Sequence, residues 1–385
     1  MNDTMLKADQ PQAAAVAFQN RILAEVSRTF ALTIPALPER LRASVTNAYL
    51  LCRIADTIED DPALDLAAKK VWGDRFVAAI HGVCPVADFA RELAPRLSSA
   101  SLPGEHELIR QSGQVLGVTH SLSVRERAAL ERCVALMNAG MLRYQQRASL
   151  AGLPDMRALN EYCYFVAGVV GEMLTELFCE HSPEIACRRQ QLLELAPSFG
   201  QGLQMTNILK DIWEDRRRGV CWLPRTEFGL DPSGRDDLIG AMEPEAFRQR
   251  LENLVIVAHG HLRNALEYTL LIPRRFAAIR RFCLWALGMA VPTLDNIYHN
   301  SAFSAGRDIK ISRRQVRRIV RNYGLFAGQD WILKRMFRAA SARLPRSDPG
   351  VRAGLDAIAQ AAAARVERTQ NAEIDNRSLS TGRHV

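Results

Sequence analysis

The sequence predicts an all-α protein with a single domain, and three observations carry this prediction. Apolar residues recur at spacings of three and four over long segments, which is the period of a helix with a buried face. Aromatic residues make up only 7% of the 385 residues, whereas Ala and Leu are abundant, a mixture that favours helices. We find no pattern of two alternating strands joined by a turn.

Six segments show the helical period clearly. The helix expected at 158–181 is apolar on most faces and contains Gly168 and Gly171, whose small size allows close helix approach or leaves room for a ligand. Breakers between the segments are too short to be domain linkers. We therefore expect one domain over residues 15–345 and a tail over 346–385 that is partly helical and then disordered. The predicted helices are 13–34, 45–55, 126–150, 158–181, 194–215 and 251–272.

Charge and cysteine content narrow the class of protein. The net charge of +8 suits anionic partners or simply a mildly basic soluble protein. Basic and aromatic residues do not interleave, so we expect no nucleic-acid partner. The eight cysteines form no C-x-x-C pair, which favours reduced, mostly buried thiols. The polar N-terminus does not resemble a signal peptide, and the longest apolar run, 282–294, is too short to span a bilayer. We expect a cytoplasmic protein.

Two acidic clusters of identical spacing follow apolar helical segments. Asp56, Glu59 and Asp60 lie at i, i+3 and i+4, so they share one helix face. The second cluster, in NILKDIWED, repeats this spacing with Asp211 and Asp215 and with Glu214 between them. Such a pattern should occur about 0.5 times by chance in this composition. One cluster alone would be interpreted as a solvated helix end, but two favour a functional pair.

The chemistry of carboxylates explains why two clusters would be needed. Acids at a helix C-terminus are disfavoured by the helix dipole and repel one another, so a divalent cation is expected. Mg²⁺ prefers oxygen ligands and binds through a few carboxylates together with substrate phosphates. Two facing clusters could hold Mg²⁺ on both sides of a diphosphate and make it a better leaving group. An apolar helical cavity would then protect an allylic carbocation from water.

Polar residues around the second cluster have two interpretations each. Asn207, one turn earlier, could add an amide oxygen to the metal site or form a buried hydrogen bond. Lys210 could contact phosphate. The arginines at 216–218 could bind diphosphate, or could offset the acids and complete the helix end. Asp61, the last acid before Pro62, is left unassigned, and a solvated neighbour of the first cluster is its simplest interpretation.

Four segments together resemble the squalene and phytoene synthase family in motif, order and spacing. They are SRTFAL (27–32), RIADTIEDD (53–61), YCYFVAGVVGEMLTELF (162–178) and QMTNILKDIWEDRRRGVCWLP (204–224). The resemblance covers most of residues 20–325 and is closest to bacterial squalene synthases. It implies the all-α isoprenoid synthase fold with a central apolar cavity. The implied activity is Mg²⁺-dependent joining of two farnesyl diphosphates to presqualene diphosphate, followed by NADPH-dependent reduction to squalene.

The resemblance also implies a set of site residues. The metal site would comprise Asp56, Glu59, Asp60, Asn207, Asp211 and Asp215, with Tyr162 assisting proton removal beside Asp56, Asp60, Asp211 and Asp215 as catalytic residues. Substrate or cofactor phosphates would be bound by Ser27, Arg28, Arg53, Lys210, Lys310 and Arg313. The apolar pocket would be lined by Phe30, Val166, Phe282 and Cys283.

Two positions depart from the family pattern. Val220 stands where many relatives have an Arg, so Arg217 or Arg218 would have to supply that phosphate contact. Ser312 stands where some squalene synthases have a basic residue, which weakens the NADPH prediction, although Arg313 or Arg314 could replace it. The alternatives are therefore an enzyme that stops at presqualene diphosphate, one that makes dehydrosqualene or phytoene, and a binding protein without turnover.

The basic stretch at 306–322 is a further candidate surface. Arg317, Arg318 and Arg321 recur at helical spacing, which is typical of a solvated face. The same residues could contact an anionic membrane peripherally, at the inner face where a C30 product would be delivered. The sequence does not predict an oligomeric state.

Overall fold

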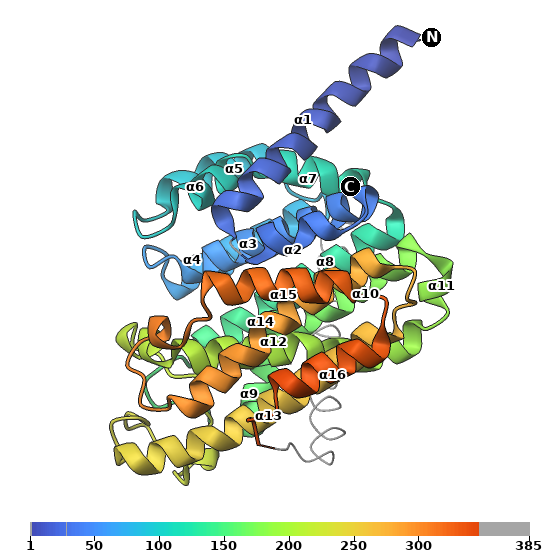
Figure 1. The fold of residues 1–385 in the computed structure, drawn as a ribbon. Helices are drawn as coiled ribbons and strands as arrows, with labels where there is room; N and C mark the ends of the chain where they lie inside the picture. Colours follow the sequence, from blue (N-terminus) through green and yellow to red (C-terminus); the bar gives the residue numbers. More distant parts are fainter. Residues whose placement is uncertain (1, 28, 346–385) are drawn as a thin grey trace.

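The computed structural model describes residues 2–27 and 29–345, and its ordered elements are almost entirely helical (Figure 1). Arg28 and the predicted tail at 346–385 lie outside the described residues. Within the described part, the only β pairing is an isolated bridge between Leu153 and Pro224. The prediction of an all-α single domain is confirmed.

The helices follow one another along the chain with short connections. The α-helices are α1 (Asn2–Val26), α2 (Thr29–Thr33), α3 (Glu39–Asp60), α4 (Leu66–Ile80), α5 (Val86–Leu93), α6 (Pro103–Arg110), α7 (Ser112–Ser121), α8 (Val124–Gln145), α9 (Met156–Cys163), α10 (Val169–His181), α11 (Pro183–Ala186), α12 (Arg189–Arg217), α13 (Pro244–Leu271), α14 (Ala277–His299), α15 (Arg313–Leu325) and α16 (Asp330–Ala340). Tighter or wider turns form η1 (Ile34–Ala36), η2 (Ala94–Arg96), η3 (Tyr164–Gly168), η4 (Arg225–Phe228) and η5 (Gly306–Ile309).

Helix α12 is the structural centre of the molecule. It packs against α10, α13 and α14, and Figure 1 shows α8, α10, α12 and α14 between α1–α7 at one end and α13 at the other. Glycines allow α12 to approach α10 and η3 closely. A methyl group on Gly171 would lie 2.1 Å from the carbonyl oxygen of Ala196, and one on Gly200 would lie 2.1 Å from that of Ala167. The close approach expected from the glycines at 168 and 171 is confirmed.

The chain from Met156 to His181 runs as one helical rod that is interrupted by the π-helical segment η3. A π segment inserts one extra residue into an α-helix and changes the direction of the side chains around it. Tyr162 lies just before this segment and Val166 lies within it. The segment therefore determines how two predicted site residues are directed.

Several observed helix ends differ from the predicted bounds by a few residues, and the clearest difference is a break in the first predicted helix. The expected helix at 13–34 is broken after Val26, and the chain resumes as α2 at Thr29. Ser27 explains the break, because its hydroxyl oxygen accepts a hydrogen bond from the Phe30 backbone N–H at 3.0 Å. A serine at this place caps the start of the next helix rather than continuing the previous one.

Cysteine burial and apolar helices also bear on the predictions. All eight cysteines are free thiols; Cys84 is half-buried, Cys187 is exposed, and the other six are buried, as expected.

Among the described residues, the helical segments Met156–His181 and Ala277–His299 are long and apolar enough to cross a membrane by composition alone. Most of each lies buried inside the fold, which is equally typical of core helices.

Candidate active site

The first acidic cluster occupies the last two turns of α3. Asp56 and Glu59 project from the helix shortly before it ends at Asp60. Glu59 accepts a hydrogen bond from the Gln145 side chain at the end of α8. Arg53, one turn before Asp56, lies with its guanidinium 4.0 Å from the Asp56 carboxylate. Glu59 and Asp56 are thus held by neighbouring side chains, whereas Asp60 at the helix end is exposed.

Asp61 does not belong to this cluster, and the prediction that it is solvated is wrong. Its side chain is buried and accepts hydrogen bonds from the backbone N–H groups of Ala63 and Ser98 at 2.9 Å each and from the Ser101 hydroxyl at 2.7 Å. Burial opposes ionisation, but these hydrogen bonds outweigh it and lower the pKa of Asp61. Asp61 therefore fastens the end of α3 to the 98–101 loop.

The second acidic cluster occupies the last turns of α12. Lys210 contacts one of its members, with its ammonium 3.0 Å from Asp211, and also donates to the Asn207 amide oxygen at 3.2 Å. Glu214 points to a different element, because its carboxylate accepts hydrogen bonds from the Gly306 backbone N–H at 3.0 and 3.2 Å. Asp215 is the member that lies near the first cluster, because Arg218 contacts both Asp215 and Asp60, whereas Asp211 pairs with Lys210.

The two clusters face each other across a short gap. Arg218, at the end of α12, places its guanidinium 3.0 Å from Asp60 and 3.9 Å from Asp215. Burial raises the pKa of Tyr162 well above the usual range, and the negative charges of Glu59, Asp215 and Asp60 add to this rise. Tyr162 therefore lies near carboxylates of both clusters. The predicted pairing of the acidic motifs is therefore met by the fold.

Burial, and then repulsion between carboxylates, raises the pKa values of three carboxyl groups in the site. Loss of water and the neighbouring Asp60 raise the pKa of Asp56 to about 7 and that of Glu59 to about 8. For Asp215, loss of water is again the main cause, and the nearby carboxylates Asp211 and Asp60 add to it against the opposing Arg218, so that its pKa rises to about 6. The site concentrates more negative charge than its own cations balance.

This donor set fits Mg²⁺ that is bound jointly with a phosphate ligand. The residues that would hold it are Asp56, Glu59 and Asp60 on one side and Asp211 and Asp215 on the other, all with hard carboxylate oxygens. Across residues 12–27 and 29–345, no group of three His, Cys, Asp or Glu side chains already converges on one ion position.

The raised pKa values predict how stability depends on pH and Mg²⁺. Asp56, Glu59 and Asp215 bind protons more tightly in the folded than in the unfolded chain, so the stability they contribute is lost as pH rises from about 4 towards about 8. Mg²⁺ should offset this loss. We expect the increase in Tm caused by Mg²⁺ to be larger at pH 8 than at pH 5.5, measured by differential scanning fluorimetry. An equal increase at both values would contradict the assignment.

Tyr162 is held by an aromatic stack beside the carboxylates. Its ring lies parallel to that of Trp222, with centroids 4.2 Å apart and an interplanar angle of 10°. On another side, the Tyr144 ring lies 5.2 Å away in a tilted arrangement. Stacking of this kind fixes the ring while leaving the hydroxyl to be directed by its surroundings. Trp222 comes from the loop after α12, which pairs with the 149–153 loop through the Leu153 backbone.

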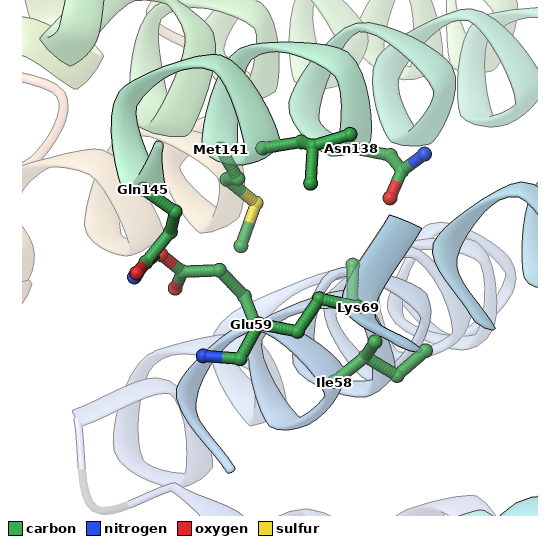
Figure 2. Close-up of a pocket in the computed structure, with 8 residues that line it drawn as sticks. Ile58, Glu59, Lys69, Asn138, Met141 and Gln145 are labelled. Carbon is green, nitrogen blue, oxygen red and sulfur yellow. Dashed lines mark hydrogen bonds between the residues drawn. The ribbon is translucent and has the colours of Figure 1, made fainter. Parts of the chain in front are cut away.

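A small pocket lies behind the first cluster, between α3, α4 and α8. Figure 2 shows Glu59 reaching from α3 towards Gln145, with Lys69 close by and Met141 and Asn138 on the opposite wall. The positive charge of Lys69 partly opposes the rise of the Glu59 pKa. The predicted metal ligand Glu59 is therefore also part of this pocket, where its carboxylate lies near Gln145 and Lys69.

The predicted phosphate-binding residues near the first acidic cluster already contact other groups of the protein to different extents. Arg53 forms an ion pair with Glu105 of α6, yet its buried Nε atom has no hydrogen-bond partner among the described residues. An unsatisfied buried donor beside the acidic cluster suits an anionic ligand. Ser27 is used as the cap of α2, as described above, and Arg28 lies outside the described residues.

The predicted phosphate-binding residues on the second side lie around η5 and α15. Lys310 and Arg313 are both exposed, immediately before and at the start of α15. Ser312 between them is the N-cap of that helix, accepting from the Gln315 backbone N–H at 3.2 Å. The departure from a basic residue at 312 therefore has a structural reason. The helix N-terminus with its flanking cations remains suited to a phosphate group.

The predicted apolar pocket residues are found in or next to the core. Phe282 and Cys283 are buried on α14, and the Phe282 ring packs edge-on against Phe178 with centroids 6.3 Å apart. Phe30 and Val166 are half-buried, and the Phe30 ring lies 4.9 Å from that of Tyr49. Their joint lining of a substrate cavity stays a prediction.

Several residues with clear roles were missed by sequence reasoning. Trp222, Gln145 and Glu105 contact predicted site residues from elements far away in the chain. The sequence offers little signal for Gln145 and Glu105, which follow ordinary helical patterns. Trp222 directly follows the second acidic motif, and its position before Leu223 and Pro224 is the one hint that was available.

Comparison with known proteins supports the same grouping. A family model described as squalene/phytoene synthase matches residues 23–315. The squalene synthase of Candida albicans is 27% identical over 334 residues, covering 84% of this chain and 70% of its own. A solved complex of TcSQS with the ligand BPH1237 superposes with a TM-score of 0.69 at 23% identity, covering 92% of this chain and 99% of that one. A ligand-bound dehydrosqualene synthase gives 0.58 at 21% identity, covering 86% and 99%.

Proposed function

The chain belongs to the squalene/phytoene synthase family, and from this premise we propose that it joins two farnesyl diphosphates head to head and reduces the product to squalene. The observation that carries the proposal is that two acidic clusters, from α3 and α12, approach each other: Arg218 contacts Asp60 of one and Asp215 of the other, and Tyr162 lies near carboxylates of both. When bound, Mg²⁺ supplies the positive charge that turns diphosphate into a good leaving group.

The chain's own residues provide the remaining parts of the first half-reaction. Forming the cyclopropane of presqualene diphosphate removes one diphosphate and one proton from the two substrates. The raised pKa keeps the Tyr162 hydroxyl protonated and neutral. Its oxygen can accept the departing proton while its own O–H proton passes to the released diphosphate, so that Tyr162 ends the step uncharged. Burial of the ring between Trp222 and Tyr144 excludes water from this side of the cation.

A Tyr162→Phe variant tests this role. The phenyl ring preserves the stack on Trp222, and only the hydroxyl is lost. We expect the rate of presqualene diphosphate formation to fall about 100-fold, the usual magnitude for a positioned proton-transfer group. The thermal midpoint serves as the control and should move by only a few degrees. A variant of wild-type rate would remove Tyr162 from the mechanism.

The second half-reaction would use NADPH, and two features around α15 and one relative support it. Lys310 and Arg313 are exposed next to a helix N-terminus, which favours phosphate groups. The connection to the acidic site is direct, because η5, just before Lys310, donates the Gly306 N–H to Glu214 of the second cluster. The curated squalene synthase relative also supports squalene rather than phytoene as the end product.

The product assay distinguishes the proposed reaction from its alternatives. Purified protein is incubated with farnesyl diphosphate and Mg²⁺, with and without NADPH, and the products are identified by mass spectrometry. Squalene that forms only with NADPH supports the proposal. A cyclopropyl diphosphate or a dehydro product that is independent of NADPH would show that reduction is absent.

We also propose a cytoplasmic protein whose α15 contacts an anionic membrane peripherally. Ile319 and Tyr323 face Gly288 of α14, and the arginines of the helix are exposed. At the end of this face, Leu325 and Trp331 are 72% and 69% exposed. Basic residues beside exposed apolar ones suit an anionic lipid surface. The exposed arginines include Arg314, Arg317, Arg318 and Arg321.

Flotation with liposomes tests the membrane proposal. Wild-type protein should float with vesicles that contain phosphatidylserine, and a triple variant R317E/R318E/R321E should not. Vesicles of neutral lipid serve as the control for charge. Absence of wild-type protein from the anionic vesicle fraction would remove this proposal.

A further inference from the structure

The three consecutive arginines that end α12 have different partners. Arg216 donates to Asp237 at 2.6 Å and ties the helix to the 231–240 loop. Arg217 lies 3.4 Å from Glu214, one turn earlier on its own helix. Arg218 alone reaches across to the other acidic cluster, at 3.0 Å from Asp60, while it stays 3.9 Å from Asp215. The ambiguity that the sequence left among these arginines is resolved by their contacts.

The end of α12 has the geometry that points Arg218 across the site. Gly219 adopts a left-handed conformation with φ of 83° and donates its N–H to the Arg216 carbonyl at 3.0 Å. The Val220 N–H donates to the Asp215 carbonyl at 3.0 Å. These two hydrogen bonds form a Schellman cap, in which a glycine follows the last helical residues and an apolar residue comes next. Val220 is therefore explained as part of the cap, and Arg218 becomes the cation that the turn presents to the acids.

Arg218 occupies the carboxylates that a metal ion would need. Its two nitrogens approach Oδ1 of Asp60 and Oδ1 of Asp215, which come from two different helix C-termini. Both termini carry the negative end of a helix dipole, so a cation between them is favoured. The Arg218 and Asp60 side chains are 61% and 53% exposed, and an exposed ion pair shifts an equilibrium by about fivefold at most. The contact is thus strong enough to order the site and weak enough to be displaced.

We propose that Arg218 is an exchangeable cation of this active site. Without metal it bridges the two acidic clusters and competes with Mg²⁺ for Asp60 and Asp215. When Mg²⁺ and a diphosphate enter together, the released guanidinium turns to the diphosphate and holds it by charge-assisted hydrogen bonds. The second half of this statement rests on the proposed function, whereas the competition with Mg²⁺ rests on the contacts alone.

Calorimetric titrations of an Arg218→Ala variant test the two halves separately. Titrated with Mg²⁺ alone, the variant should bind about two- to fivefold more tightly than wild type, because the competing cation is gone. Titrated with inorganic pyrophosphate at saturating Mg²⁺, it should bind about tenfold more weakly, because a charged donor is lost. A purely structural role of Arg218 would not produce tighter Mg²⁺ binding together with weaker pyrophosphate binding. Loss of such a role would weaken both affinities or leave both unchanged.

Arg217→Ala is the matched control, since it removes the neighbouring exposed arginine and leaves the bridge intact. It should change neither affinity by more than about twofold. The proposal is overturned if Arg218→Ala leaves Mg²⁺ affinity unchanged or weakened, if it leaves pyrophosphate affinity unchanged, or if Arg217→Ala gives the same pair of effects. Neither titration requires turnover. The product assay can therefore fail while the titrations still show that Arg218 competes with Mg²⁺, and the two proposals are tested separately.

Discussion

Replacing Asp56 or Asp211 by Asn should lower the rate of diphosphate release by about 10²–10³-fold. Each variant removes one carboxylate charge from one of two facing clusters, and electrostatic stabilisation of a departing anion is usually worth this much per group. Because the pKa of Asp56 is raised to about 7 by loss of water and by Asp60, neutralising it should not weaken the fold. We expect Tm in the absence of Mg²⁺ to be equal to or above that of wild type.

The measurement is release of pyrophosphate from farnesyl diphosphate, followed with a coupled assay. Glu194→Gln is the control for the second cluster, because it neutralises an exposed acid several turns earlier on the same helix. Its rate should equal that of wild type. Full activity in either Asp variant would refute the metal assignment, and inactivity of the wild type would leave the binding protein without turnover as the better description.

Gly200→Ala is expected to have the largest effect on stability. The added methyl group would lie 2.1 Å from the Ala167 carbonyl oxygen and 2.4 Å from its carbon. Both atoms belong to the backbone of the helical rod that carries Tyr162, so no side chain can move aside. We expect a loss of about 3 kcal/mol or more in the free energy of unfolding, at or above the upper range for overpacking. Chemical denaturation followed by circular dichroism measures it.

Gly117→Ala supplies the matched control for that substitution. Gly117 also lies within a helix, α7, but nothing lies within 4 Å of the position of an added methyl group. There the change should stabilise the protein by up to about 1 kcal/mol, because alanine has the higher helix propensity. If both variants lost similar stability, the close approach of α12 to the 156–181 rod would not be the cause.

The main features of the fold and of the site could be predicted because they follow local periodicities. Apolar spacing placed the long helices, and the repeated acidic pattern at 56–60 and 211–215 predicted two clusters on helix ends that face each other. Such patterns are visible in sequence because each depends on the 3.6-residue period of one helix. The conclusion that the two acidic clusters act together rests on chemistry, because Mg²⁺ ions on both sides of a diphosphate require carboxylates on both sides.

The features that could not be predicted depend on contacts between distant segments. Asp61 has the same type and neighbourhood as Asp60, yet the 98–101 loop turns it into a buried cap. Ser312 looked like a missing cation, although it begins α15 as its N-cap. Val220 looked like a missing arginine, although it completes the cap that presents Arg218. In each case the residue type serves a local backbone requirement that a motif comparison does not contain.

A crystal structure with Mn²⁺ and an unreactive thio-analogue of farnesyl diphosphate tests the central claim most directly. Mn²⁺ replaces Mg²⁺ at oxygen ligands and is located by its anomalous signal. We predict metal ions within about 2.0–2.4 Å of carboxylate oxygens from both clusters, Asp56 or Asp60 on one side and Asp211 or Asp215 on the other, with the diphosphate between them. Metal bound to only one cluster, or a diphosphate bound away from both, would contradict the account.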